Sequence, residues 1–270
     1  MFGTPEFPAY KVVFITAGIG MLVSLVWFWF GRAQLQGVGR PLEGAEGKGR
    51  VLMTAVLALV AIPVVYFLLS IGAGALQWIL SALFVALCVL ILREGFKDGA
   101  VRRDMAIAML IIFVFNVLFW CFFEQAGSSF NFLADKIVDR DLGGWEFPTA
   151  WFQSVNSVAI ITLAPIMAWL WVRMGRVNPS IPRKFGLGLI FNGVAFLLLM
   201  FALTQLVDGS GKIPFWTLLV VYVIQSVGEL CLSPIGLSMT TKLAPARLSG
   251  FAMGCWFLSI AIGNNLAGIF

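Results

Sequence analysis

The sequence predicts an all-α membrane protein with about eight membrane-spanning helices. Hydrophobic residues make up 60% of its 270 residues and charged residues only 11%, whereas a soluble domain typically carries about 25% charged residues. Eight segments are apolar enough and long enough to cross a bilayer, which takes about 20 residues. Because lipid offers no hydrogen bonds to the backbone, spans of this length are predicted to be helices, which satisfy their own backbone groups.

The predicted spans follow one another with short connections. They cover residues 12–31, 52–71, 74–92, 105–127, 149–172, 185–206, 214–238 and 248–270. Only Gly72 and Ala73 separate the second span from the third, so we expect a tight helical hairpin there. Pro63 is expected to bend the first arm of this hairpin, because proline removes a hydrogen bond from a helix interior.

The basic residues predict the orientation of the chain. Fourteen of its 18 Lys and Arg residues fall in four alternate connections, at 32–51, 93–104, 173–184 and 239–247. Cytoplasmic loops carry the excess of basic residues, so these connections are predicted to be cytoplasmic and the amino-terminus to lie outside. The first span lacks the basic segment and cleavage site of a signal peptide. With a last span that runs to the final residue, this pattern leads us to expect a piece of a longer protein, with helices missing on both sides.

Composition and motifs argue against several kinds of chemistry. The chain has no histidine, which is the commonest metal ligand and proton-transfer group. Its four cysteines lie in apolar runs and form no C-x-x-C pair. It also lacks a Gly-rich phosphate loop and a nucleophile elbow, and no basic cluster adjoins a soluble domain. We therefore expect neither an enzyme nor a nucleic-acid partner, no metal and no cofactor, and we expect any proton chemistry to depend on carboxyl groups.

Two carboxyl groups, those of Glu124 and Glu229, lie within predicted spans. A charge at mid-bilayer costs at least about 2.5–3.5 kcal/mol, so such residues are candidates for function. Asn116, Trp120, Glu124 and Ser128 recur every four residues, which predicts one helical face turned toward a cavity or another helix. The alternative is that Glu124 lies far enough along its span to reach the lipid headgroups.

Glu229 has the more polar surroundings of the two. Gln225 precedes it and Ser233 follows it at four-residue spacing, Gly228 leaves room beside it, and Pro234 permits a bend. Burial favours the neutral form of a carboxyl group, and a group poised to change its charge is what proton coupling requires. The alternative is a neutral glutamate that is hydrogen-bonded across helices and has no function.

The fifth predicted span adds further polar side chains. Gln153, Asn156 and Ser157 lie along one face of it. They could bind polar groups of a small solute, or they could hold helices together. Trp256, in the last span, could line a cavity or serve in packing alone.

Four segments around these residues resemble the proton-coupled oligopeptide transporter family (POT, also called PTR) of the major facilitator superfamily. They are FWCFFEQAGSS at 119–129, FQSVNSVAI at 152–160, GELCLSPIGLSMTTKLAP at 228–245 and, more loosely, GCWFLSIAIGNNLAG at 254–268. The resemblance implies three parts: a sixth-helix-like span and cytoplasmic linker over 1–50, an inserted helical hairpin and linker over 51–104, and a carboxy-terminal bundle over 105–270. That bundle would hold the seventh to eleventh helices of the family, and the fold would be incomplete.

The resemblance also implies a function and a set of site residues. It implies symport of di- and tripeptides with protons, by alternating access, across the cytoplasmic membrane of a bacterium. Glu124 and Glu229 would take part in proton coupling, and the substrate-binding residues would be Trp120, Asn156, Glu229, Ser233 and Trp256. Some family members carry a second acid just before the first glutamate, where this chain has Phe123, so the coupling role of that pair would fall on Glu124 alone.

The same resemblance implies partners and a limit. The partners would be small peptides, protons, membrane lipid and a missing amino-terminal transporter half, with the proton gradient as energy source. The first-helix E-x-x-E-R motif of the family is absent, so the chain alone would form half of a binding site and is expected not to transport. The alternatives are a related transporter of another small solute such as nitrate, an intramembrane lipid-processing enzyme, or a purely structural membrane subunit.

Overall fold

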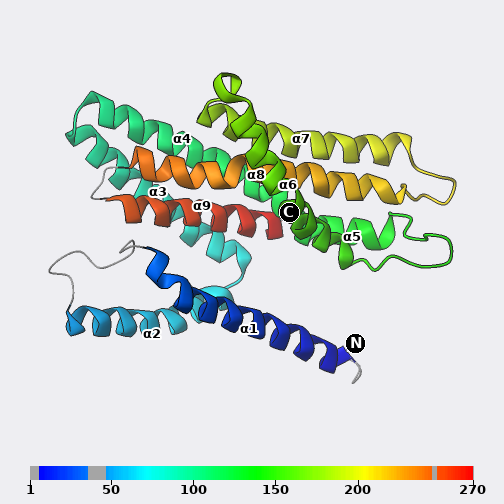
Figure 1. Cartoon of the computed structure of the whole chain (residues 1–270), viewed down its shortest axis with the longest axis horizontal. Coiled ribbons are helices and arrows are strands. Elements are labelled where there is room, and N and C mark those ends of the chain that lie inside the picture. The colour runs from blue at the N-terminus through cyan, green and yellow to red at the C-terminus, as the bar shows by residue number, and fades with distance from the viewer. Residues whose placement is uncertain (1–5, 36–46, 245–247, 270) are drawn as a thin grey trace. The chain divides into compact units, whose positions relative to one another are not determined.

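The computed structural model describes residues 6–35, 47–244 and 248–269, and nearly all of these residues are helical (Figure 1). Eight helical segments among them are long enough and apolar enough to cross a membrane, which confirms the predicted number of spans. The chain falls into two units that divide between Tyr66 and Phe67.

The first unit contains α1 (Glu6–Gly31), a 3₁₀ turn (Arg32–Leu35) and most of α2 (Lys48–Ser70). Along α1 the large apolar side chains are exposed, among them Trp27 and Phe30. Such a surface is stable only against lipid or against another protein surface. The predicted connection at 32–51 lies mostly outside the described residues.

The second unit contains the remaining helices: α3 (Ala73–Lys97), α4 (Ala100–Phe123), α5 (Ser129–Lys136), α6 (Trp151–Arg173), α7 (Ile181–Gln205), α8 (Phe215–Leu243) and α9 (Ser249–Ile269). Helix α8 is central, because it packs against α4, α6, α7 and α9 (Figure 1). Helix α4 packs mainly against α9, and α3 packs against both. The site described below lies where α4, α6 and α8 meet.

Several helices run farther than the charge-free segments predict. The connection predicted at 93–104 is only Asp98 and Gly99, since α3 continues to Lys97 and α4 begins at Ala100. Gly99 has a φ of 93°, which a residue with a side chain rarely adopts. The basic residues here lie on helix ends because long Lys and Arg side chains can reach the headgroups from a helix that is still regular.

The predicted uninterrupted helical face from Asn116 to Ser128 is wrong beyond Phe123. Helix α4 ends there, a 3₁₀ turn covers Glu124–Gly127, and α5 begins at Ser129. The apolar span as a whole extends from Ala100 to Lys136, nine residues beyond the predicted end at 127. Glu124 therefore lies at a break within a long span.

Two predicted outer connections meet at one end of the second unit. The Asp139 amide donates to Ile213 O at 2.9 Å, and the Ile213 amide donates to Ile137 O at 2.9 Å. Within the first of these connections, Arg140 forms an ion pair with Glu146 at 2.7 Å. Both connections were assigned to the same side of the membrane from the basic residues, and the contact between them supports that assignment.

Two glycines let α7 and α8 approach closely. A Cβ placed on Gly188 would lie 2.8 Å from Gly228 O and 2.8 Å from the Leu232 Cβ, and a Cβ placed on Gly228 would lie 2.9 Å from Gly188 O. Close backbone approach at small residues is the usual way in which membrane helices associate, because lipid removes most of the hydrophobic driving force between them.

We expect Gly188→Ala and Gly228→Ala each to destabilise the protein by about 1–3 kcal/mol, because each forces overpacking at this contact. Thermal unfolding in detergent measures the effect. Gly193→Ala is the matched control, since Gly193 is also in α7 but has nothing within 4 Å of its Cβ position. If all three variants unfold at the same temperature, the close contact does not limit stability.

Candidate functional site

A polar cavity of about 200 Å³ lies where the end of α4, α6 and α8 come together. Its wall is formed by Phe123, Glu124, Ala126, Gly127, Gln153, Asn156, Tyr222 and Gln225. Of the residues predicted to form the site, Glu124 and Asn156 line this cavity directly. The cavity therefore brings together side chains that are 32 positions apart in the sequence and come from different helices.

Asn156 connects the cavity to Glu229. The Asn156 side-chain amide donates to Glu229 Oε2 at 3.2 Å and to Ser226 Oγ at 3.0 Å. Ser226 Oγ in turn donates to the Tyr222 carbonyl oxygen at 2.8 Å. Asn156 and Glu229 are both half-buried, so Asn156 holds α6 against α8 and also lies on the cavity wall. The two roles that the sequence left open for it are compatible in one geometry.

The turn that carries Glu124 is held in place by its neighbours. The Tyr222 hydroxyl of α8 donates to Ala126 O at 3.1 Å. The Gln125 side-chain amide donates to Ala267 O of α9 at 3.3 Å. Glu124 itself is half-buried and lines the cavity. Glu229 is linked to the same cavity wall by its hydrogen bond from Asn156.

Gln225, on the cavity wall, and Asn192 behind it form a chain of two buried amides, neither of which was predicted as a site residue from the sequence. Gln225 Nε2 donates to Asn192 Oδ1 at 3.0 Å, and Asn192 Nδ2 donates to the Phe119 carbonyl oxygen at 3.3 Å. Gln225 and Asn192 are 1% and 4% exposed. The available signal was weak: each is a single amide within an apolar span, which is also what ordinary helix association produces.

The other predicted site residues lie outside the cavity wall. The Trp120 indole donates to Asn116 Oδ1 at 3.1 Å, and the Asn116 amide donates to Ser259 Oγ at 2.7 Å. Trp256 is 1% exposed, packs in the apolar core and has its ring 6.3 Å from that of Phe113. Ser233 Oγ is buried and has no hydrogen-bond partner.

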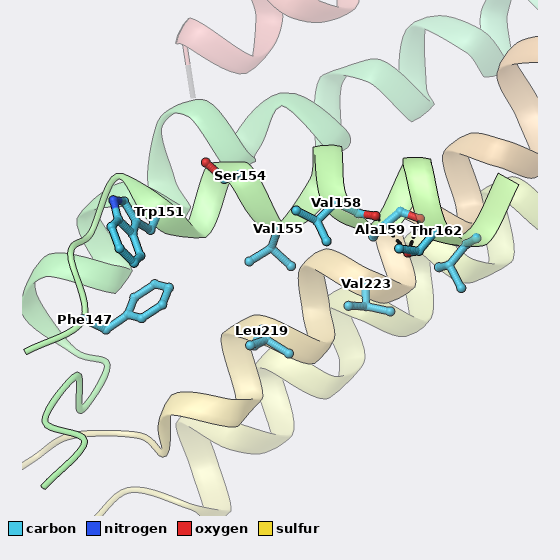
Figure 2. A pocket seen from close by; sticks show the side chains of 10 residues that line it. Phe147, Trp151, Ser154, Val155, Val158, Ala159, Thr162, Leu219 and Val223 are labelled. Carbon is cyan, nitrogen blue, oxygen red and sulfur yellow. Dashed lines mark hydrogen bonds between the residues drawn. The ribbon is translucent and has the colours of Figure 1, made fainter.

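The other face of α6 borders a larger, apolar pocket of about 480 Å³ (Figure 2). Figure 2 shows Phe147 and Trp151 at one end, and Val155 and Val158 along the wall opposite α8. The Thr162 hydroxyl already donates a hydrogen bond within its own helix, to Val158 O at 2.8 Å. Ser154 adds a second hydroxyl, but no ionisable side chain lines this pocket, so the amide side chains of α6, Gln153 and Asn156, are on the wall of the polar cavity instead.

No group of three His, Cys, Asp or Glu residues in the described part of the chain could hold a metal ion. The polar side chains of the cavity wall are one carboxyl group, three amides and a phenol. Such groups can bind the ammonium and amide groups of a small polar solute, and they can exchange protons.

A family model described as the POT family matches residues 6–270. The chain belongs to the POT family. Membership confirms the resemblance inferred from the four sequence segments, and it makes the chain part of a transporter family rather than of an enzyme family.

Two relatives show how the chain compares with known proteins. It is 35% identical over 276 residues to the peptide transporter YePEPT of Yersinia enterocolitica, with 93% of this chain and 53% of the relative covered. It is 33% identical over 273 residues to the dipeptide and tripeptide permease A of Erwinia pyrifoliae, with 99% of this chain and 55% of the relative covered. The chain thus spans about half the length of the curated relatives it matches.

The fold is also similar to a solved transporter. A crystal structure of a mutant of the peptide transporter POT, in complex with alafosfalin, aligns with a TM-score of 0.72 at 32% identity. The alignment covers 96% of this chain and 54% of that structure. This similarity confirms the predicted fold, which is a major-facilitator-type bundle that represents about half of such a transporter.

We expect Asn156→Leu to destabilise the protein by about 1–3 kcal/mol, because it leaves Glu229 and Ser226 without their donor. Asn156→Leu should cost clearly less in a Glu229→Leu background, where one of the stranded acceptors is gone. A double-mutant cycle on unfolding in detergent measures this coupling. Gln153→Leu, an exposed amide one turn away on α6, is the control. Strictly additive effects would mean that the bond between Asn156 and Glu229 contributes nothing to stability.

Proposed function

We propose that the transporter containing this sequence carries small peptides across a membrane in symport with protons. Membership of the POT family and the similarity to proteins named as peptide transporters support the class of solute. The observation that supports the proton coupling is that Glu124 lines the polar cavity while Asn156, on the same wall, donates a hydrogen bond to Glu229.

In this proposal the two glutamates change charge as the solute binds. Asn156 and Glu229 offer a carbonyl oxygen and a carboxyl group to the ammonium group of a peptide. Protonation of a carboxyl group removes its attraction for a cation, so proton and solute occupancy become coupled at Glu229. Trp120, Ser233 and Trp256 are proposed to contact the rest of the solute when the site is complete.

The proposal requires a second half of the site. The curated relatives are about twice as long as this chain, and transporters with inverted repeats bind their solutes between two bundles near mid-membrane. We therefore assign residues 105–270 to one bundle, 51–104 to an inserted hairpin and 1–50 to the preceding span and linker. Alternating access would follow from rocking of the two bundles around the site, as ligands shift the population of the two states.

The remaining assignments follow from the same proposal. The protein would reside in a bacterial cytoplasmic membrane, where a proton gradient supplies the energy and no cofactor is needed. Small peptides, protons, membrane lipid and the other transporter half are its proposed partners. An intramembrane enzyme is disfavoured because the family is one of transporters.

Proteoliposomes that contain the complete transporter test the proposal. We expect an inward proton gradient to drive accumulation of a labelled dipeptide. Glu124→Gln and Glu229→Gln should each abolish accumulation, because an amide cannot release a proton. Asp104→Asn is the control, since Asp104 is exposed and pairs with its neighbour Arg103, and it should accumulate dipeptide normally.

Uptake that ignores the gradient, or that survives the double change Glu124→Gln and Glu229→Gln, would contradict proton coupling through these residues. The solute is identified by adding either an unlabelled dipeptide or nitrate and measuring which of them reduces the uptake. If nitrate competes and dipeptides do not, the peptide assignment is wrong while the proton assignment stands on the gradient experiment.

A further inference from the structure

Gln225 is the most buried polar residue of the cavity wall, and one of its atoms has no partner. Its side-chain oxygen Oε1 is buried and accepts no hydrogen bond from any described residue. A buried acceptor left unpaired costs about 1–3 kcal/mol, so such an atom in a folded protein calls for an explanation. Gln225 lines the polar cavity together with Glu124, and this position offers one.

The orientation of the Gln225 amide follows from the backbone. The Phe119 carbonyl oxygen can only accept, so Asn192 must turn its Nδ2 toward it. Asn192 therefore turns its Oδ1 toward Gln225, and Gln225 donates a hydrogen bond to it from Nε2. Flipping either amide would place two acceptors or two donors against each other. The free atom of Gln225 is consequently an acceptor, set by a chain that starts at a backbone carbonyl.

A comparison with Gln125 shows that this arrangement is not general for the site. Gln125 is also buried, at 8% exposed, but both ends of its amide are used. Its Nε2 donates to Ala267 O, and its Oε1 accepts from the Ser129 hydroxyl at 2.6 Å. Gln225 alone of the two keeps an unused acceptor, and it is the one that lines the cavity.

We propose that Gln225 Oε1 is an acceptor subsite of this cavity, which binds an O–H or N–H donor between Gln225 and Glu124. The donor is either a water molecule or an N–H group of the solute, and both fit the chemistry of a wall with a carboxyl group and an amide oxygen. A cavity of about 200 Å³ has room for a buried water, which needs only about 10–15 Å³ of probe-occupied volume and two to four polar partners. The solute source rests on the function proposed above, whereas the water source does not.

The groups that can affect Glu124 here are few. Glu229 is hydrogen-bonded to Asn156 of the cavity wall, and Tyr222 shares the wall with its hydroxyl bonded to Ala126 O. From α6, Gln153 and Asn156 face the cavity and are uncharged. Helix α9 carries no charged residue, and the only charged residue of α6 is Arg173 at its last position. No cation is among the described residues that line the cavity. The effect of a substitution at Gln225 on the protonation of Glu124 can therefore be measured without interference from a lining Lys or Arg.

The variants separate the subsite from the fold. Gln225→Met removes the acceptor at similar volume but strands Asn192 Oδ1. The double change Asn192→Leu and Gln225→Met removes the amide chain altogether and leaves no stranded side-chain partner, so it avoids the cost of a buried unpaired side-chain acceptor. We expect the double variant to fold at least as well as Gln225→Met and to show the same loss at the site.

The first readout is independent of transport. In the complete transporter with Glu229 intact, labelling of Glu124 by dicyclohexylcarbodiimide is measured by peptide mapping as a function of pH, with and without dipeptide. We expect both Gln225 variants to move the midpoint of labelling by about 0.5 pH unit or more, the size of shift that loss of a hydrogen bond produces. A shift without dipeptide identifies water as the donor, and a shift only with dipeptide identifies the solute.

The second readout is uptake in proteoliposomes with Glu229 intact. If the solute supplies the donor, KM for dipeptide should rise roughly 3- to 10-fold with little change in maximal rate. If water supplies it, the pH profile of uptake should move at constant KM. Absence of uptake by the unchanged protein would contradict the proposed function, and the labelling profile would still decide the subsite. Unchanged labelling midpoints in both folded variants, under both conditions, would overturn the subsite.

Discussion

The break in α4 has to keep its backbone hydrogen-bonded in a segment long and apolar enough to lie in lipid. Water is scarce there, and each unsatisfied backbone group costs several kcal/mol. Four carbonyl oxygens around the break accept bonds from side chains: Phe119 O from Asn192, Cys121 O from Gln125, Ala126 O from Tyr222 and Gly127 O from Asn131. The donors come from α7, α8 and the segment itself. A span that leaves the α-helical path at Glu124 is stable because these side chains are in place.

The same requirement explains why the cavity lies where it does. Side chains that supply donors to the break must be polar, and each polar side chain brought into the bundle also brings atoms that need partners. Tyr222 lines the cavity and also donates a hydrogen bond to the break. Gln225 lines the cavity too, and it contacts the break indirectly through its hydrogen bond to Asn192. The break therefore concentrates polar groups beside Glu124. The need to hydrogen-bond the backbone at the break thus explains the polar cavity beside Glu124 as much as a role in binding does.

The bundle could be predicted from the sequence because composition and basic residues report on lipid directly. Charge-free runs located all eight spans, since a span that contains charge is expensive. Helix ends were less accurate: Lys97 and Arg102 belong to helices because their long side chains reach polar surroundings without ending the helix. The break at Glu124 could not be predicted, because the signal that ends α4 is a set of bonds from Asn192 and Tyr222, which lie 68 and 98 positions farther along the chain.

The candidate site could be predicted from the sequence only at residues whose own side chain has a high free-energy cost in lipid. Glu124 and Glu229 are such residues, and Asn156 links Glu229 to the wall of the cavity that Glu124 lines. Asn192 and Gln225 are not, because a single amide in a span has an ordinary packing use. Trp256 illustrates the converse, since an aromatic residue in a span can be core or wall, and here it lies in the core beside Gly236, where a Cβ would clash with its ring. The sequence cannot separate these cases because the neighbouring helix decides them.

Asn156 is where the fold and the proposed mechanism share one interaction. A hydrogen bond to an ionised group contributes about 1.5–3 kcal/mol, and one between neutral groups about 0.5–1.5 kcal/mol. A change in the charge of Glu229 would therefore alter the contact between α6 and α8 by roughly 1 kcal/mol, the difference between those ranges. That is too little to separate two packed helices, but it is enough to change a two-state population about fivefold. This bias acts on a rocking equilibrium where the geometry of the bond between Asn156 and Glu229 differs between the two states, because only then does the charge of Glu229 stabilise one state more than the other.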